Sequence, residues 1–468
     1  MPDVLQHASR IRIETIRSTS EKKRADLAQH LTPFETAKLA ASMFSQLESW
    51  QKSIRCLDLG AGTGMLSLAL YDRFGESIEK LDAVEMDIEL ATVFEAEMAI
   101  AGIPYELIQG DALVDTPEAF YDKIILNPPY KKMAANDSRQ NSLPCRSANL
   151  YSAFMAIGLS RLVEDGELVA IVPRSWMNGG YFEPFRKYAF SFCSLDAVHV
   201  YESRAEVFSD TDVLQETIIV KFSKRSQSEQ VVVSKSLGKG DEVSYATYAA
   251  QDLIDPRSFI VRIAPKDEVG LRETIGSLGL CPSTGKVVDF RCKDIIFRER
   301  PQCRDVYPMI YAGNFQHGVL EHPLDIGKPQ WFKVDADNKK AKKQLIRSGP
   351  YVVVKRFSTK EERRRVVARP LLLDSSVALE NHLNFIHAGT PRNVVPLRSV
   401  ELANGLSIWL NSTYLDRWFR DVSGSTQVNA GDIKSMPCPP LDLLEEAGKH
   451  WRANLTQDEI DEICEALI

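Results

Sequence analysis

The chain has 468 residues, of which 44% are hydrophobic and 26% are charged, and its formal net charge is −7. These values are typical of a globular protein with two or three domains, and no stretch is apolar enough for a membrane span or a secretory signal. We therefore expect a cytoplasmic protein in which any nucleic-acid surface is a local basic patch.

The eight cysteines include no CxxC pair, and their spacing matches no standard pair of zinc ligands. The sequence therefore predicts reduced, scattered thiols and no metal site.

The first predicted elements are two helices, over residues 4–28 and 34–47. Thr32 is suited to cap the second helix, with Pro33 at its first position. Capping alone explains these two residues. Their place just ahead of a glycine-rich loop also makes them candidates for a binding site.

That loop follows a predicted strand over residues 54–59 and precedes a predicted helix over residues 65–74. Its pattern is Asp-x-Gly-x-Gly-x-Gly, formed by Asp58, Gly60, Gly62 and Gly64, and it differs from the dinucleotide pattern Gly-x-Gly-x-x-Gly. Strand, glycine turn and helix let the backbone approach a ligand and direct helix N–H groups toward it.

Acidic side chains follow the next two predicted strands. Glu85 ends the strand over residues 80–84, roughly twenty residues beyond the last glycine, where a carboxylate can bind ribose hydroxyls. Asp111 follows the strand over residues 105–109. Since the carboxyl ends of parallel strands form the ligand-binding edge of an open α/β sheet, we expect these acids to lie together.

The fourth predicted strand is followed by a stiff polar segment from Asn127 to Tyr130, which we call the hook. The apolar run 124–126 is suited to a buried parallel strand, and Asn127-Pro128-Pro129-Tyr130 comes next. Each proline lacks an N–H, fixes φ and excludes the residue before it from the helical region. The hook therefore carries an amide at one end and a phenol at the other.

The rest of the first half completes the predicted sheet. Residues 131–147 form a polar segment, either a mobile loop closing over a nucleotide or a solvated connection. A helix is expected over residues 150–162 and strands over 166–173, 195–200 and 216–222. Phe222 ends the last strand, where an aromatic ring is more often part of the core than functional.

A polar stretch over residues 225–244 predicts a domain boundary, which divides the chain into residues 1–235 and 236–468. The second half is expected to be a mixed α+β domain. Its segment 339–369 holds twelve Lys or Arg residues against two Glu, which fits either phosphate contacts or a solvated charged face. The candidate DNA-binding residues are Lys355, Arg356, Arg363, Arg364 and Arg365.

Residues 25–223, with the segment from Gln29 to Pro33, the glycine loop and Asn-Pro-Pro-Tyr in this order, resemble the γ-class (TaqI-type) type II DNA adenine-N6 methyltransferases of restriction–modification systems. The resemblance implies a Rossmann-like S-adenosylmethionine-dependent domain followed by a target-recognition domain. It implies cofactor binding by Thr32, Pro33, Asp58, Gly60, Gly62, Gly64, Glu85 and Asp111. It also implies catalysis by Asn127, Pro128, Pro129 and Tyr130, with Phe222 stacking on the extruded base. The glycine loop departs from the TaqI form and follows the general methyltransferase pattern.

The resulting hypothesis is a monomeric, site-specific methyltransferase that flips an adenine out of double-stranded DNA and protects host DNA from a separate restriction endonuclease. Two alternatives remain from the residues alone. The same hook occurs in methylases of other planar amino or amide groups, those of ribosomal RNA and of release-factor glutamine. The chain could also be a DNA-binding subunit without catalysis.

Overall fold

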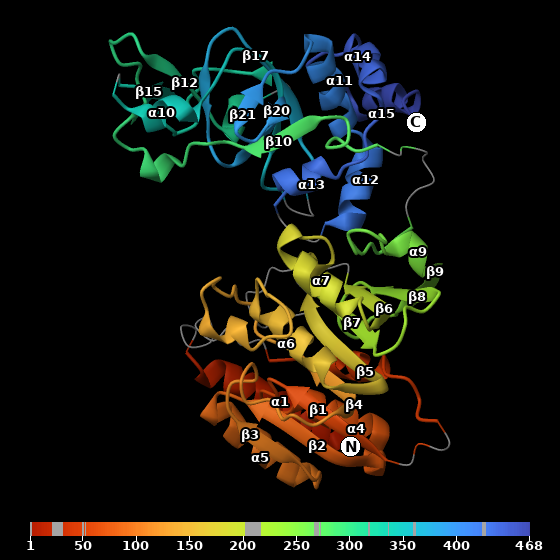
Figure 1. Cartoon of the computed structure of the whole chain (residues 1–468). Helices are drawn as coiled ribbons and strands as arrows, with labels where there is room; N and C mark the ends of the chain where they lie inside the picture. The colour runs from red at the N-terminus through yellow and green to blue at the C-terminus, as the bar shows by residue number, and fades with distance from the viewer. Residues whose placement is uncertain are drawn as a thin grey trace. The chain divides into compact units, whose positions relative to one another are not determined.

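A computed structural model describes residues 2–20, 31–48, 51, 53–201, 217–265, 271, 273–316, 319–335, 337–358, 362–423 and 427–468. The chain divides into two compact units, Met1–Pro265 and Lys266–Ile468, which Figure 1 colours from red to green and from green to blue. In the parts of the chain given above, none of the helices combines the length and apolar character that crossing a membrane requires.

The first unit is built on a nine-stranded sheet in the order β3-β2-β1-β4-β5-β7-β6-β8-β9. The first five strands are parallel, β7 is antiparallel to both β5 and β6, β8 is parallel to β6, and β9 is antiparallel to β8. The strands are β1 (Ile54–Leu59), β2 (Ile78–Glu85), β3 (Glu106–Gln109), β4 (Tyr121–Leu126), β5 (Leu162–Pro173), β6 (Ser194–Tyr201), β7 (Thr217–Ser223), β8 (Gln230–Ser236) and β9 (Ser244–Ala249).

Helices bury both faces of this sheet, because successive side chains of a strand point to opposite faces. In β4, Ile124 belongs to one core cluster and Ile125 to the other. Residues of α1 (Pro2–Ser18), α3 (Phe34–Ser42), α4 (Met65–Phe74) and α5 (Ile88–Ala101) belong to the cluster that contains Ile125. Residues of α6 (Leu150–Ser160) and α7 (Glu183–Ala189) belong to the cluster that contains Ile124.

The predicted strands and helices of this unit are found with small changes in their ends. The helix predicted over 34–47 ends at Ser42, and α1 ends at Ser18, whereas residues 21–28 of the first predicted helix lie outside the described ranges. The predicted boundary after residue 235 is wrong. The polar run contains β8 and the connection to β9, which extend the sheet, and Val231 and Val233 of β8 are buried in its core. The first unit continues to Pro265.

The second unit is mixed α+β, as expected. One sheet has the order β10-β20-β17-β18 with β21 on β20, another has the order β11-β15-β12-β19-β16, and β13 pairs with β14. The strands are β10 (Leu280–Thr284), β11 (Ile296–Phe297), β12 (Val306–Ile310), β13 (Phe315–Gln316), β14 (Val319–Leu320), β15 (Trp331–Lys333), β16 (Leu345–Ile346), β17 (Gly349–Lys355), β18 (Ala368–Leu373), β19 (Val377–Leu379), β20 (Leu383–Thr390) and β21 (Asn393–Val395).

Helices of the second unit pack closely where glycines permit it. A Cβ on Gly405 would lie 1.8 Å from the Leu444 carbonyl oxygen, and a Cβ on Gly448 would lie 1.9 Å from the Glu401 carbonyl oxygen. The backbones of α11 and α14 can therefore touch only because both residues lack a side chain. The helices are α10 (Lys339–Gln344), α11 (Val400–Leu410), α12 (Thr413–Val422), α13 (Ala430–Lys434), α14 (Leu441–Gly448) and α15 (Gln457–Glu465).

Candidate active site

A cavity of about 410 Å³ lies at the carboxyl ends of the parallel strands of the first unit. The segments that follow β1, β2, β3 and β4 all contribute to its wall, as the sequence predicts for an open α/β sheet. The predicted residues that line it are Thr32, Gly60, Gly62, Glu85, Asp111, Asn127 and Pro129.

The glycine loop after β1 depends on backbone angles that other residues rarely adopt. Gly60, Gly62 and Gly64 have φ values of +77°, +57° and +86°. At Gly64 a Cβ would also lie 2.8 Å from Cε of Met98 and 3.0 Å from the Phe94 ring, so these side chains would have to shift. The loop therefore keeps the backbone next to the cavity and leaves space beside it.

Glu85 holds this loop from the end of β2. One carboxylate oxygen, Oε2, accepts a hydrogen bond of 2.8 Å from the backbone N–H of Gly62. The other, Oε1, accepts one of 2.8 Å from the backbone N–H of Asp87. Burial raises the pKa of Glu85, although these backbone donors oppose the rise. A buried carboxylate fixed in this way faces the cavity with little freedom to move.

Asp111 is paired with an arginine that sequence reasoning did not single out. Nη1 of Arg139 lies 2.8 Å from Oδ2 of Asp111, and Nη2 lies 2.7 Å from Oδ2 of Asp137. Hydrogen bonds from Arg139 lower the pKa of Asp137 to about 2. Of the polar segment 131–147, the residues Lys131, Lys132, Ala134, Asp137 and Arg139 line the cavity. This segment is therefore part of the cavity wall and more than a solvated connection.

The hook after β4 presents the Asn127 amide at the edge of the cavity. Its Nδ2 donates to Oγ1 of Thr32 at 2.9 Å, and its Oδ1 accepts from the Tyr130 hydroxyl at 3.1 Å. The Tyr130 hydroxyl also lies 3.1 Å from the Ile171 carbonyl oxygen. Burial raises the pKa of Tyr130, so the phenol stays neutral and keeps its proton for these contacts.

Six of the residues predicted for catalysis or cofactor binding do not line the cavity: Pro33, Asp58, Gly64, Pro128, Tyr130 and Phe222. Asp58 is completely buried, and its Oδ2 accepts a hydrogen bond of 2.8 Å from Oγ of Ser67. Burial raises its pKa to about 7. The Tyr130 ring is half-buried and makes an edge contact with Tyr151, at a centroid distance of 6.3 Å.

The expectation that Phe222 stacks on an extruded base is wrong. Its side chain is 0% exposed and packs against Trp176 and Phe190, at centroid distances of 5.7 and 6.1 Å. Because β7 runs antiparallel to β5, its first residue, Thr217, pairs with Pro173 at the carboxyl edge, whereas Phe222 pairs with Leu168 toward the other edge. Strand direction therefore carries this ring away from the cavity and into the core.

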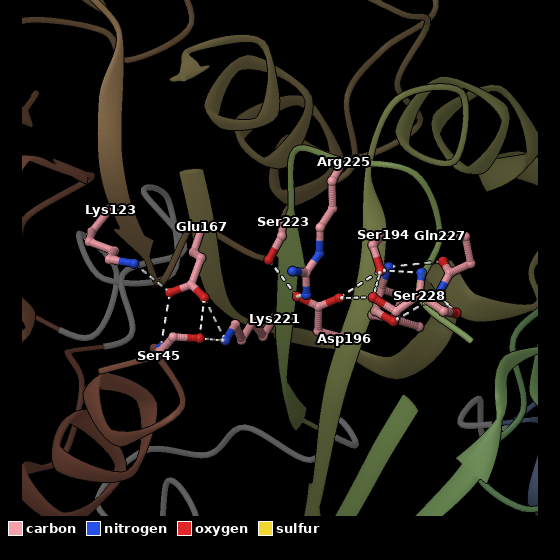
Figure 2. Close-up of polar contacts among 11 residues, drawn as sticks. Ser45, Lys123, Glu167, Ser194, Asp196, Lys221, Ser223, Arg225, Gln227 and Ser228 are labelled. Atoms are coloured by element: carbon pink, nitrogen blue, oxygen red, sulfur yellow. Dashed lines mark hydrogen bonds and ion pairs between the residues drawn. The ribbon is translucent and has the colours of Figure 1, made fainter. Parts of the chain in front are cut away.

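A buried ion cluster lies toward that other edge, and Figure 2 shows it. Each Glu167 carboxylate oxygen lies 2.7 Å from an ammonium group, Oε2 from Nζ of Lys123 and Oε1 from Nζ of Lys221. Ser45 adds a backbone N–H and a hydroxyl donor, at 3.0 and 2.6 Å. Burial alone would raise the pKa of Glu167, but the two ammonium groups outweigh it and lower the pKa to about 2.

The basic segment of the second unit is divided between a cavity, the surface and the core. Lys355 lines a cavity of about 400 Å³ together with Arg369 and Phe315. Arg363 is exposed, and Arg364 donates to the Asn411 carbonyl oxygen at 2.9 Å.

Arg356 and Arg365 are held by neighbouring groups. Arg356 donates to the Asn381 carbonyl oxygen at 3.1 Å. Arg365 is 0% exposed, and its Nε donates to Oγ of Ser358 at 3.1 Å. The prediction that Arg365 contacts DNA is therefore wrong in this structure, because its guanidinium is enclosed by the protein.

The sheet order and the glycine loop held by Glu85 define a Rossmann-like S-adenosylmethionine-dependent methyltransferase. Residues 34–208 match the family described as Eco57I restriction-modification methylase. The chain is 35% identical to the type II methyltransferase M.BsuBI of Bacillus subtilis, covering 96% of this chain and 95% of that protein. It is 32% identical to the type II methyltransferase M.PstI of Providencia stuartii, covering 95% and 93%.

The chain therefore belongs to the type II methyltransferases of restriction–modification systems, and S-adenosylmethionine is its cofactor. Among solved structures, the type IIL restriction-modification enzyme MmeI in complex with DNA matches with a TM-score of 0.56. That match covers 100% of this chain and 75% of MmeI at 10% identity, so it supports the fold alone.

Proposed function

We propose that the chain methylates the exocyclic N6 of adenine at a specific site in double-stranded DNA, and that this protects host DNA from a restriction endonuclease on a separate chain. The observation that carries the proposal is the Asn127 amide at the cavity edge, with Nδ2 on Thr32 and Oδ1 on Tyr130. A planar amino nitrogen needs oriented acceptors of this kind, and no covalent enzyme intermediate.

The cavity suits S-adenosylmethionine by the acceptors and the open backbone that line it. Glu85 supplies a buried carboxylate for the ribose hydroxyls, and Gly60 and Gly62 leave the backbone accessible to the amino-acid part. Asp111 accepts from the adenine amino group, which requires it to share its carboxylate with Arg139. When bound, the cofactor supplies an electrophilic methyl group on a sulfonium centre.

Asn127 acts on the target nitrogen. Its Oδ1 and the Pro128 carbonyl oxygen accept hydrogen bonds from the two N–H groups of the target amine, which draws the lone pair out of conjugation with the ring. The nitrogen takes up the methyl group as the methyl–sulfur bond breaks, and it then releases one of its two protons to solvent. The Tyr130 proton has a second acceptor at the same distance, the Ile171 carbonyl oxygen. Asn127 Oδ1 can therefore accept from substrate while the Tyr130 hydroxyl stays paired, and Tyr130 offers one face to the base.

The second unit supplies DNA contacts in this proposal. Lys355, Arg356 and Arg363 contact phosphates, and Arg369 joins them because it shares the cavity of Lys355. We propose that one copy of the chain acts on one site as a monomer. Methylation of RNA or of a release-factor glutamine is less favoured, since nothing in those reactions requires a second unit of about 200 residues.

The test is methyl transfer from labelled S-adenosylmethionine to duplex DNA, RNA and release factor in parallel, with nucleoside analysis of the product. We expect N6-methyladenine from DNA alone. Asn127→Ala should lower the transfer rate by about 10²- to 10³-fold or more, as loss of one positioned hydrogen-bonding group does in other enzymes. Its affinity for the cofactor should stay within a few-fold.

Asn454→Ala, at an exposed amide of the second unit, is the matched control and should keep the wild-type rate. Label in RNA or protein, or in the cytosine of DNA, would contradict the proposed substrate. Normal turnover by Asn127→Ala would contradict the proposed role of the hook.

A further inference from the structure

Tyr181 is the most exposed of the large apolar side chains in the described parts of the chain. Its side chain is 86% exposed and lies in the short helix η4 (Gly180–Phe182). A single exposed aromatic residue is common on protein surfaces and implies nothing by itself. Its position and the way in which its backbone is held are the informative features.

Tyr181 follows the carboxyl end of β5, the strand that lies beside β4 and its hook. Strand β5 is parallel to β4 and ends at Pro173, and the chain continues from there through η3 (Arg174–Met177) to η4. Two successive aromatic contacts link the hook to η4. The ring centroids of Tyr130 and Tyr151 are 6.3 Å apart, and those of Tyr151 and Phe182 are 5.4 Å apart. Tyr181 is therefore adjacent in sequence to Phe182, whose ring contacts Tyr151, which in turn contacts Tyr130 of the hook.

Buried groups fix the backbone that presents Tyr181. Arg186 is 2% exposed, and its Nη1 donates to the carbonyl oxygens of Trp176 and Gly179 at 2.9 and 2.8 Å. The N–H of Phe182 donates to the Gly179 carbonyl oxygen at 3.0 Å, and the Phe182 ring is 7% exposed.

Gly179 has no space for a larger residue, because a Cβ would lie 2.9 Å from the Ser175 carbonyl oxygen. Because the backbone is anchored on both sides, only the rotation of the Tyr181 side chain has to be fixed when the ring binds a flat partner.

We propose that Tyr181 stacks on a nucleobase left unstacked at the mouth of the active site when the target adenine leaves the duplex. This inference rests on the proposed function. Extrusion removes stacking from the target and its neighbours, and aromatic side chains replace it. Phe222 cannot do so from the core, whereas Tyr181 is accessible and follows the carboxyl end of β5.

The experiment compares Tyr181→Ala, Tyr181→Phe and the matched control Tyr245→Ala. Tyr245 is 69% exposed on β9, an edge strand that is five places from β4 in the strand order. Tyr245→Ala therefore removes the same kind of side chain on a strand far from the hook. The readouts are affinity for cognate duplex DNA by fluorescence anisotropy, methyl transfer with KM and kcat separated, cofactor affinity and thermal melting.

We expect Tyr181→Ala to weaken DNA binding by about tenfold to hundredfold, the range for loss of one base–aromatic contact, and to raise KM for DNA. Tyr181→Phe should stay within about threefold of wild type because it keeps the ring. Melting temperature and cofactor affinity should not move, and Tyr245→Ala should match wild type throughout.

Two results would overturn the inference. One is a DNA affinity of Tyr181→Ala within twofold of that of Tyr245→Ala. The other is an equal loss of DNA affinity in Tyr181→Ala and Tyr181→Phe, which would assign the contact to the hydroxyl. Failure of the wild-type chain to methylate DNA would instead overturn the proposed function.

Discussion

The two edges of the nine-stranded sheet carry similar kinds of residues with opposite results. At the carboxyl edge, Glu85 and Asn127 face a cavity of about 410 Å³. Toward the amino edge, the Glu167 carboxylate is buried between two ammonium groups (Figure 2). The Phe222 ring is buried there among other rings. A charge or an aromatic ring on a strand therefore indicates function only when the strand carries it to the open edge.

The two edges therefore contribute to different free energies, the amino edge to folding and the carboxyl edge to ligand binding. Buried groups of the amino edge stabilise the fold, since removing one leaves a cavity or an unpaired charge. Groups at the carboxyl edge are held in place for a ligand, and their loss should affect binding and chemistry with little effect on folding. Variants at the two edges should therefore change different measurements.

Phe222→Ala should have the largest effect on stability. Loss of a fully buried ring at the amino edge should lower the free energy of unfolding by about 3–5 kcal/mol. Chemical denaturation measures it, with Phe222→Leu as a milder control because it keeps most of the volume. An unchanged free energy of unfolding together with impaired methyl transfer would show that Phe222 acts at the site and not in the core.

Glu167→Gln should lower the free energy of unfolding by about 3–5 kcal/mol, because Lys123 and Lys221 lose their shared counter-charge in the interior. Glu164→Gln is the control, an exposed carboxylate on the same strand, and should cost under about 1 kcal/mol. If both variants unfold alike, the buried cluster contributes nothing.

The pH dependence of stability follows from the same ion cluster. The pKa of Glu167 is about 2 in the folded chain, below its ordinary value of 4.5. The unfolded chain therefore binds the proton first, and this contribution to stability is complete above about pH 4.5 and is lost as the pH falls toward 2. In urea unfolding at several pH values, Glu167→Gln should show a shallower acid dependence in that window than wild type.

Glu85→Ala tests the carboxyl edge and should weaken S-adenosylmethionine binding by about 1–3 kcal/mol, through lost hydrogen bonds to a charged group. Isothermal calorimetry on the free protein measures it, and Glu89→Ala, at an exposed carboxylate on α5, should bind normally. Because burial raises the pKa of Glu85, wild-type affinity should begin to fall on acidification above the ordinary carboxyl range. Equal affinity in both variants would place the cofactor elsewhere.

The smallest expected effect extends the comparison to the second unit. Lys355→Gln and Arg369→Gln should each reduce the slope of log K against log salt for DNA binding by about 0.9, the value for one phosphate contact. Lys342→Gln, on the exposed side of α10, is the control. Arg365→Gln should instead lower thermal stability and leave the slope unchanged, because its guanidinium is buried. A smaller slope for Arg365→Gln would instead indicate that Arg365 contacts DNA phosphate.

Local sequence was sufficient for much of the first unit. The glycine loop, the acid after β2 and the proline hook depend on φ angles, on missing N–H groups and on strand ends, which neighbouring residues decide. For that reason β1 and α4 have the predicted bounds, and Glu85 and Asn127 meet at one cavity.

The sequence by itself determined the order of strands and helices around the glycine loop, the open edge at which ligand-binding residues collect, and the family resemblance of the hook. Tertiary structure alone decided that β7 runs antiparallel and buries Phe222, that Arg139 pairs with Asp111, and that Arg365 is enclosed while Lys355 and Arg369 share a cavity. The physical reason is distance along the chain. Turns and strand ends are set by adjacent residues, whereas burial and ion pairing depend on groups that only folding brings together.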